Sequence, residues 1–212
     1  MIDLDDITIR SRSVSEMANN VYLLTSKTTG VQLLIDAADD PDAIRAMLDE
    51  ARADSAEPTR VACIVTTHSH WDHVRALDEL VRDTGAQTAA GLEDVADIEV
   101  PTDHPLEAGP LDIAGAPALE VIKLRGHTPG SVALLYRDPS GPAHLFTGDS
   151  LFPGGVGNTF GDSGNFASLI ADVTERVFDV LPDDTIVHPG HGDGTTLGAE
   201  RPHLQEWRER GW

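Results

Sequence analysis

The stretch that decides the fold runs from position 61 to 73, Val-Ala-Cys-Ile-Val-Thr-Thr-His-Ser-His-Trp-Asp-His. It begins with a continuous apolar run, Val61–Val65, which is typical of a buried central strand. Side chains two apart in an extended chain share one side, so His68, His70 and Asp72 are expected to converge. His73 is expected to start a helix that returns its side chain to the same place. Imidazole and carboxylate are ligands for zinc and iron, so the segment predicts a metal site.

Working outward, the chain alternates between strand and helix patterns. Strands are predicted at Ile7–Arg10, Asn20–Thr25, Val31–Ile35, Ala118–Leu124, Val132–Tyr136, Ala143–Phe146 and Thr185–Val187. Helices are predicted from Asp40 to Arg52, from His73 to Gly85, over Phe166–Leu181, and over Thr196–Arg210 with an interruption near Pro202. Strand clusters in both halves, each mixed with helices, indicate two sheets covered by helices. No low-complexity linker divides the sequence, so a single domain over residues 1–212 is expected.

Charge and composition limit the partners. The 212 residues include 36 acidic and 15 basic side chains, which gives a formal net charge of −21. Nucleic acid and anionic membranes attract Lys and Arg, so neither is an expected partner. The one cysteine, Cys63, excludes an internal disulfide and is predicted to lie in the core. The acidic start of the chain lacks the pattern of a secretory signal, and no apolar stretch is long enough to span a membrane, so a cytoplasmic protein is expected.

Three further candidate metal ligands each lie in a glycine-containing turn that follows a predicted strand. They are His127 in Gly-His-Thr-Pro-Gly, Asp149 in Thr-Gly-Asp-Ser and His191 in Pro-Gly-His-Gly. Loops at strand ends present functional groups on a rigid scaffold, and glycine allows the backbone to approach a metal closely. Each signal is weak alone, because most single histidines are ordinary surface or core residues. Together with the dense cluster at positions 68–73 they predict one composite metal site.

With these motifs, the sequence resembles the metallo-β-lactamase superfamily, and within it the glyoxalase II-like hydrolases. The resemblance extends to Asn19–Leu24 and Leu34–Asp36, which look like the first hairpin of that family. It implies an α+β fold, an αβ/βα four-layer sandwich. Two mixed β-sheets would pack face to face with helices on both outer sides and the metal site at one edge.

The resemblance also implies a role for each motif residue. The first metal would be held by His68, His70 and His127, the second by Asp72, His73 and His191, and both by a bridging Asp149. Asp36 would orient the cluster without binding metal, a support that metal ligands generally need. Two divalent ions are therefore expected, with zinc favoured and iron or manganese as alternatives.

The function that follows is hydrolysis of a small thioester or ester by a hydroxide shared between the two metals. Asp72 is expected to help move a proton to the leaving group. Glutathione is not the expected carrier, because Gly157-Asn158-Thr159 stands where many relatives have a basic residue, and only Arg201, Arg208 and Arg210 follow His191 as basic residues.

Other functions remain open at this point. An iron-dependent persulfide dioxygenase would use one iron held by His68, His127 and Asp149. A lactonase or β-lactamase would use both metals on a cyclic substrate. A nuclease of the same fold is disfavoured by the acidity. The second-metal residues favour the hydrolases over the dioxygenase.

Five residues near the motifs are expected to play supporting or neutral parts. Trp71 alternates with the ligands and is expected to pack against the protein rather than to form a pocket wall. His188 is expected to be structural or to support the ligands. His104, His144 and His203 have no partner motif and are expected at the surface.

Overall fold

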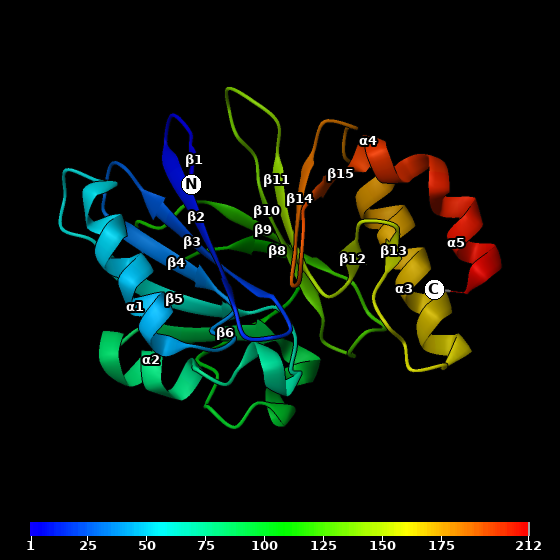
Figure 1. Ribbon diagram of the computed structural model, residues 1–212, viewed down its shortest axis with the longest axis horizontal. Helices are drawn as coiled ribbons and strands as arrows, with labels where there is room; N and C mark the ends of the chain where they lie inside the picture. Colours follow the sequence, from blue (N-terminus) through cyan, green and yellow to red (C-terminus); the bar gives the residue numbers. More distant parts are fainter. Residues whose placement is uncertain (212) are drawn as a thin grey trace.

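The computed structural model describes residues 1–211, and its larger β-sheet has seven strands in chain order (Figure 1). The strands are β1 (Ile2–Asp3), β2 (Ile7–Val14), β3 (Asn19–Ser26), β4 (Val31–Ile35), β5 (Arg60–Thr66), β6 (Gln87–Gly91) and β7 (His104–Leu106). The first four strands pair antiparallel, and the pairs from β4 to β7 are parallel. The sheet is therefore mixed, as expected.

The second sheet has six strands in the order β15-β14-β11-β10-β9-β8. They are β8 (Gly109–Leu111), β9 (Leu119–Lys123), β10 (Val132–Tyr136), β11 (His144–Gly148), β14 (Ile186–Pro189) and β15 (Thr195–Thr196). Only the β11–β14 pair is parallel. A separate hairpin joins β12 (Leu151–Phe152) to β13 (Gly155–Val156).

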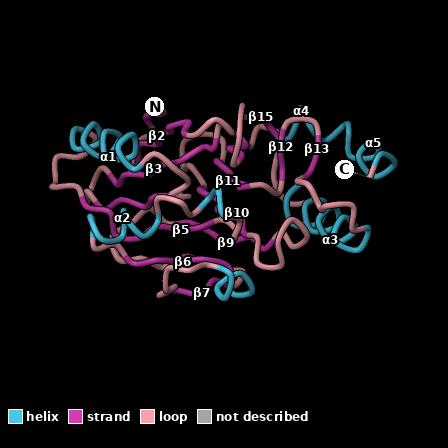
Figure 2. Tube along the Cα trace, turned by 60° about the horizontal axis from the view of Figure 1, so that its bottom comes forward, coloured by secondary structure: helices cyan, strands magenta, loops and turns pink. Residues whose placement is uncertain are grey.

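Helices cover the two outer faces. The α-helices are α1 (Pro41–Glu50), α2 (Leu77–Thr84), α3 (Ser163–Val173), α4 (Leu197–Glu200) and α5 (Leu204–Arg210). Short 3-10 turns lie at η1 (Ala51–Ala53), η2 (Trp71–His73), η3 (Leu92–Asp97) and η5 (Arg201–His203), and α3 continues into a π-helical turn, η4 (Thr174–Phe178). Figures 1 and 2 show α1 and α2 on one side of the strands and α3 and α5 on the other.

The two sheets and the helices outside them form four layers, and a cluster of apolar side chains fills each of the three spaces between them. The central one lies between the sheets and includes Tyr22, Leu24 and Cys63 from the first sheet and Phe146 from the second. The neighbours of these residues along β3, such as Leu23, face the opposite way and pack with α1 and α2. A third cluster joins the second sheet to α3 and α5. The alternation follows from the two-residue period of a strand, and it confirms the predicted four-layer sandwich and the core position of Cys63.

Two helix boundaries differ from the sequence prediction. The predicted helix at His73 is a single 3-10 turn, Trp71–His73, and α2 begins only at Leu77. Val74 has φ −129°, outside the helical range, so the turn cannot continue directly into α2. The helix predicted from Phe166 begins earlier, because Asp162 caps it by accepting hydrogen bonds from the backbone N–H groups of Gly164 and Asn165. The predicted interruption near Pro202 is present as η5.

The arrangement of strands brings distant loops to one edge. In the second sheet β9, β11 and β14 run in the same direction, so their carboxyl ends share an edge. The ends of β4 and β5 lie side by side in the first sheet. An isolated bridge between Asn19 and His191 joins the sheets at this edge. Among the described residues, no helix has the length and apolar character needed to cross a membrane.

Candidate metal centre

Each motif residue sits in the loop that leaves one of these strands. Asp36 follows β4, the segment from His68 to His73 follows β5, and His127 lies four residues beyond Lys123, the end of β9. Asp149 follows β11 and His191 follows β14. The loops converge although the residues are up to 155 positions apart, because the sandwich aligns the strand ends. The structure thus brings all seven predicted ligands into one cluster.

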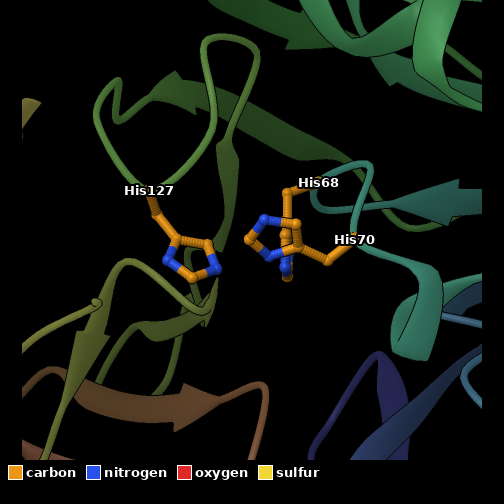
Figure 3. A group of neighbouring side chains, drawn as sticks. All are labelled: His68, His70 and His127. Atoms are coloured by element: carbon orange, nitrogen blue, oxygen red, sulfur yellow. The ribbon is translucent and has the colours of Figure 1, made fainter. Parts of the chain in front are cut away.

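The first part of the cluster consists of three histidines. His68, His70 and His127 each offer a ring nitrogen, and these atoms lie within 4.8 Å of one another. The ring centroids are 4.8 Å apart for His68 and His70, 4.7 Å for His68 and His127, and 4.5 Å for His70 and His127. Figure 3 shows the three rings turned toward one another from two separate loops. This is the arrangement of three imidazoles that can hold one cation.

The second part combines Asp72, His73 and His191, whose ligand atoms also lie within 4.8 Å of one another. Asp149 lies between the two parts. Its Oδ2 is 3.6 Å from Nε2 of His127 and 3.4 Å from Nε2 of His191, and its Oδ1 is 3.4 Å from Nε2 of His73. One carboxylate therefore faces histidines of both parts.

Hydrogen bonds fix the orientation of four of the histidines through Nδ1. His73 donates to Oδ2 of Asp36 at 2.9 Å, and His127 donates to the carbonyl of Asn158 at 2.8 Å. His191 donates to the carbonyl of Met17 at 2.9 Å, and His68 lies 3.1 Å from the hydroxyl of Thr67. That hydroxyl itself donates to Asp36, so it accepts from His68. With the hydrogen on Nδ1, the lone pair is on Nε2, which faces the cluster.

The first strands of the chain support the second part of the cluster. Asn19 is fully buried and donates from Nδ2 to both the carbonyl and Oδ2 of Asp72. Asn20 and Tyr22 hold the His191 loop, since both donate to the carbonyl of Pro189. The sequence pattern did not assign these roles, because polar residues in a strand carry no sign of a partner about 170 positions away.

The surrounding charges favour a cation. Burial lowers the pKa of His68 and of His127 below the ordinary value, so both imidazoles are neutral, as metal ligands must be. Burial also lowers the pKa of His73, but the carboxylates of Asp36 and Asp149 together outweigh it and raise the pKa to about 10. For Asp149, burial raises the pKa, but the facing imidazoles of His191 and His73 lower it by more, so the net shift is downward. The carboxylates thus remain charged and attract positive charge.

Unpartnered buried atoms provide the test of whether metal ions fit. Within residues 1–211, Nε2 of His68, Nε2 of His127 and Oδ1 of Asp149 are buried and make no hydrogen bond. Leaving a buried polar atom unpaired costs about 1–3 kcal/mol. Metal ions bound among these atoms would satisfy all three, and imidazole nitrogen with carboxylate oxygen is a donor set suited to zinc and iron.

Phe160 forms an apolar wall at this cluster; the sequence places pocket walls within Gly154–Phe166 but does not single out this side chain. Its ring is 68% exposed, yet it meets His70 edge-on at 5.7 Å and stacks over His127 at 6.1 Å. Its backbone has φ +55°, a left-handed conformation that is costly for a bulky residue and is found most often at functional sites. Asn158 fixes the turn, accepting from Phe160 N–H through its side chain.

Several supporting residues differ from expectation. Trp71 does not pack inside the protein; it is 61% exposed, with the guanidinium of Arg75 3.9 Å from its ring centre. His144 is not at the surface but 1% exposed, because its Nδ1 pairs with Nε2 of His188 at 2.9 Å across the parallel β11–β14 register. His104 is half-buried in β7. His203 is exposed, as predicted.

The sequence and this geometry agree with one family. The pattern of the Metallo-beta-lactamase superfamily matches residues 14–191, which include every member of the cluster. The chain belongs to this superfamily. Membership implies a dinuclear site for divalent metals, and the two ligand groups with Asp149 between them fit such a site.

Similar sequences carry related names. A hydroxyacylglutathione hydrolase of Fuscovulum blasticum is 32% identical over 173 residues, covering 82% of this chain and 62% of that protein. The probable metallo-hydrolase YqgX of Bacillus subtilis (strain 168) is 32% identical over 156 residues, covering 65% of this chain and 72% of that protein. The chain thus spans less than two thirds of the hydroxyacylglutathione hydrolase it matches.

Solved structures of the superfamily share the fold. ETHE1 from Myxococcus xanthus superimposes with a TM-score of 0.80 at 25% identity, covering 95% of this chain and 85% of that one. The BLEG-1 B3 metallo-beta-lactamase gives 0.78 at 27% identity, covering 94% and 99%. TTHA1623, solved in a di-iron-bound form, gives 0.71 at 30% identity, covering 91% and 96%. These matches confirm the predicted fold, and the hydroxyacylglutathione hydrolases among the similar sequences confirm the resemblance to glyoxalase II-like proteins.

Proposed function

We propose that the protein is a dinuclear metal-dependent hydrolase that acts on a small thioester or ester. The observation that carries the proposal is the convergence of five histidines and two aspartates from four loops, with three buried donor atoms left unpaired. A cluster that only stabilised the fold would have its polar atoms paired with one another. Here Nε2 of His68, Nε2 of His127 and Oδ1 of Asp149 are unpaired, and bound cations would supply their partners.

The ligands divide as follows: His68, His70 and His127 for the first ion, Asp72, His73 and His191 for the second, and Asp149 for both. The position of Asp149 supports its bridging role, since its oxygens face His73 and His127 at 3.4 and 3.6 Å. We favour zinc, with iron or manganese as alternatives, because the donor set mixes imidazole with carboxylate. Two divalent ions bound here would lower the pKa of a bound water to about 7 and polarise a substrate carbonyl.

Among the described residues, the one thiol is not placed to act as a nucleophile instead of a metal-bound water. Cys63 lies in the core between the sheets, and burial raises its pKa to about 12, so its thiol is neither accessible nor ionised. Water is therefore the nucleophile in this proposal. Asp72 is the residue positioned to move a proton, because Asn19 holds its Oδ2 at 3.0 Å and the side chain is 9% exposed. Asp72 Oδ2 would accept the proton that the attacking water loses and pass it to the leaving sulfur or oxygen.

The surroundings of the cluster support a small substrate. Phe160 supplies apolar surface for an acyl group, and the nearby cation Arg75 is already bound to Asp39 at 2.6 Å and stacked on Trp71. The net charge of −21 disfavours nucleic acid and anionic membranes as partners. A cytoplasmic location is part of the proposal, since the single cysteine is buried and unpaired.

The test is metal analysis followed by substrates of defined class. We expect about two zinc ions per chain and turnover of a panel of acyl thioesters and esters, lost after chelation and restored by zinc. A lactone and a β-lactam in the same panel address the cyclic-substrate alternative. One iron per chain, with oxygen consumption on a persulfide and no hydrolysis, would establish the dioxygenase instead. The ligand group of Asp72, His73 and His191, which a single-iron enzyme does not need, favours the hydrolase.

A further inference from the structure

Asp94 lies behind the metal centre, outside the predicted ligands, and is completely buried in η3. Its Oδ2 accepts hydrogen bonds from the backbone N–H of Ser69 at 2.8 Å and from the hydroxyl of Thr128 at 2.6 Å. Its Oδ1 accepts from the backbone N–H of Gly130 at 2.6 Å. A buried carboxylate is costly unless fully hydrogen-bonded, so three short bonds to two loops indicate a defined task.

The two loops joined by Asp94 carry the three histidines of the first metal. Ser69 lies between His68 and His70, and Thr128 directly follows His127. These loops leave different sheets, so the covalent chain does not fix their separation. Asp94 is therefore a bridge between the two halves of the three-histidine group.

The packing around this bridge is tight. A Cβ on Gly130 would lie 2.5 Å from the backbone nitrogen of Asp94, and a Cβ on Gly91 would lie 1.8 Å from the carbonyl oxygen of Gly130. Contacts below 3 Å would force the backbone to move, so both positions need glycine for this close approach. The two loops thus meet through Asp94 at a fixed distance.

The second ligand group has a different support. Asp36 accepts from Nδ1 of His73 and from the backbone N–H of Thr67, while Asn19 holds Asp72. The hydrogen bonds of Asp94 reach neither His73 nor Asp72. Asp36 reaches the first group only indirectly, through the Thr67 hydroxyl that pairs with Nδ1 of His68, so Asp94 is the carboxylate that joins the two loops of that group.

We propose that Asp94 is a positioning residue that sets the separation of His68 and His70 from His127, and thereby the affinity of the first metal site but not of the second. The inference rests on the ligand assignment of the proposed function. It is tested by metal binding alone, without any substrate, so a wrong substrate class leaves it standing. A wild-type chain that binds fewer than two ions would contradict the ligand assignment, whereas two ions bound independently of Asp94 would contradict only this inference.

The experiment measures zinc affinity by competition with a chromophoric chelator for the wild type and for Asp94→Asn. Asparagine keeps the shape of the side chain but places an NH₂ group against a donor, so one bond becomes a repulsion. Residues that support metal ligands typically change affinity by about 10- to 100-fold when replaced. We expect a loss of that size for one of the two ions and none for the other.

A double-variant cycle assigns the affected ion. In a protein that already carries His191→Ala, the second group is incomplete and Asp94→Asn should retain its full effect on the remaining ion. In a protein with His70→Ala, the first group is incomplete and Asp94→Asn should add nothing. The matched control is Asp54→Asn, since Asp54 is also a carboxylate bound to a threonine hydroxyl, that of Thr8, but away from the cluster. It should leave both affinities unchanged.

Wild-type affinity for both ions in Asp94→Asn, or an equal loss of both, would overturn the proposal. If Asp94→Asn does not fold, as judged by near-ultraviolet circular dichroism, Thr128→Val decides instead. Valine removes only the hydroxyl bond to Asp94, and we expect a threefold or larger loss of affinity for the first ion. Unchanged affinity in Thr128→Val would overturn the proposal equally.

Discussion

Strands β11 and β14 contribute to two histidine clusters of opposite character. At the carboxyl ends of these strands, Asp149 and His191 belong to the metal centre. Within the strands, His144 and His188 form a buried pair at 2.9 Å, with Phe146 stacked on His188. The difference is the presence of carboxylates. Beside Asp36 the pKa of His73 rises to about 10, whereas burial without an acidic partner lowers the pKa of His188 to about 3.

The comparison teaches that a density of histidines does not by itself define a metal site. In the strand pair, Nδ1 of His144 and Nε2 of His188 are taken up by each other, and among the described residues no third ligand atom joins them. The centre combines histidines with carboxylates and leaves Nε2 of His68 and Nε2 of His127 unpaired. Changes to the centre should therefore alter metal content and turnover, and changes to the pair should alter stability alone.

The largest effect is expected for Asp149→Ala, which removes the carboxylate between the two ligand groups. The loss leaves five histidines without their central negative charge, so the protein should retain less than one ion per chain. Hydrolysis should fall by about 1,000-fold, the upper end of the effect of removing one principal electrostatic group. Metal analysis and initial rates measure both quantities. Wild-type metal content in this variant would show that the carboxylate of Asp149 is not needed to bind the ions.

A smaller loss is expected for Asp72→Asn. The amide oxygen can still face the second ion, so part of the metal should remain, but the side chain can no longer accept a proton. General acid–base groups contribute about 10²- to 10⁴-fold, and we expect a fall of kcat of about 100-fold. Turnover at the wild-type rate would show that Asp72 moves no proton.

The strand pair is tested by His144→Leu. The change leaves Nε2 of His188 without its partner inside the sandwich, which should lower the free energy of unfolding by about 1–3 kcal/mol. Replacing both histidines with leucine removes the unpaired group and should recover part of that loss. Denaturant melts measure stability, and metal content should stay at the wild-type value in both variants. A loss of metal from His144→Leu would contradict the claim that the strand pair affects stability alone.

The buried pair of His144 and His188 should also make the stability of the protein depend on pH. His188 stays neutral in the folded protein until its pKa of about 3, whereas the unfolded chain takes up a proton near pH 6.5. The unfolded state therefore binds more protons between these values, and stability falls as pH decreases through that window by at most about 1.4 kcal/mol per pH unit from this group. The double leucine variant should have a shallower slope than the wild type in melts at pH 6.5, 5.5 and 4.5. Parallel slopes would contradict the assignment.

The smallest effect is expected for Phe160→Ala at the mouth of the centre. The ring packs over His70 and His127 without donating to either, so its loss should leave both metals bound. Removing apolar surface from a substrate contact costs about 1 kcal/mol, which corresponds to a KM about fivefold higher with little change in kcat. Steady-state kinetics separate the two parameters, and an unchanged KM for every acyl group would remove Phe160 from the substrate site.

The sequence predicts features whose interacting residues are close together in the chain, and it does not predict those whose partners are far apart. The strands Val31–Ile35 and Val132–Tyr136 match their predicted bounds, because continuous apolar runs mark buried strands. The cluster after β5 was evident because its histidines are only a few residues apart. The pairing of His144 with His188 depends instead on the register of two strands 44 positions apart.

Asp94 and Trp71 escaped prediction for a related reason. Asp94 is one of 36 acidic residues, and only the folded chain shows that its carboxylate faces two loops from other elements. Trp71 was expected to pack because it alternates with the ligands, but it lines a surface groove with Val74 and Arg75 and is 61% exposed. Alternation predicts on which side of an extended segment a side chain lies, whereas its burial depends on whether other elements pack against that side.

The most direct test of the account is the metal stoichiometry of the protein, measured by elemental analysis after zinc reconstitution and desalting. The account predicts about two ions per chain for the wild type and for the double leucine variant of His144 and His188, and less than one for Asp149→Ala. One ion or none in the wild type, or a loss of metal that follows the strand pair instead of Asp149, would contradict it.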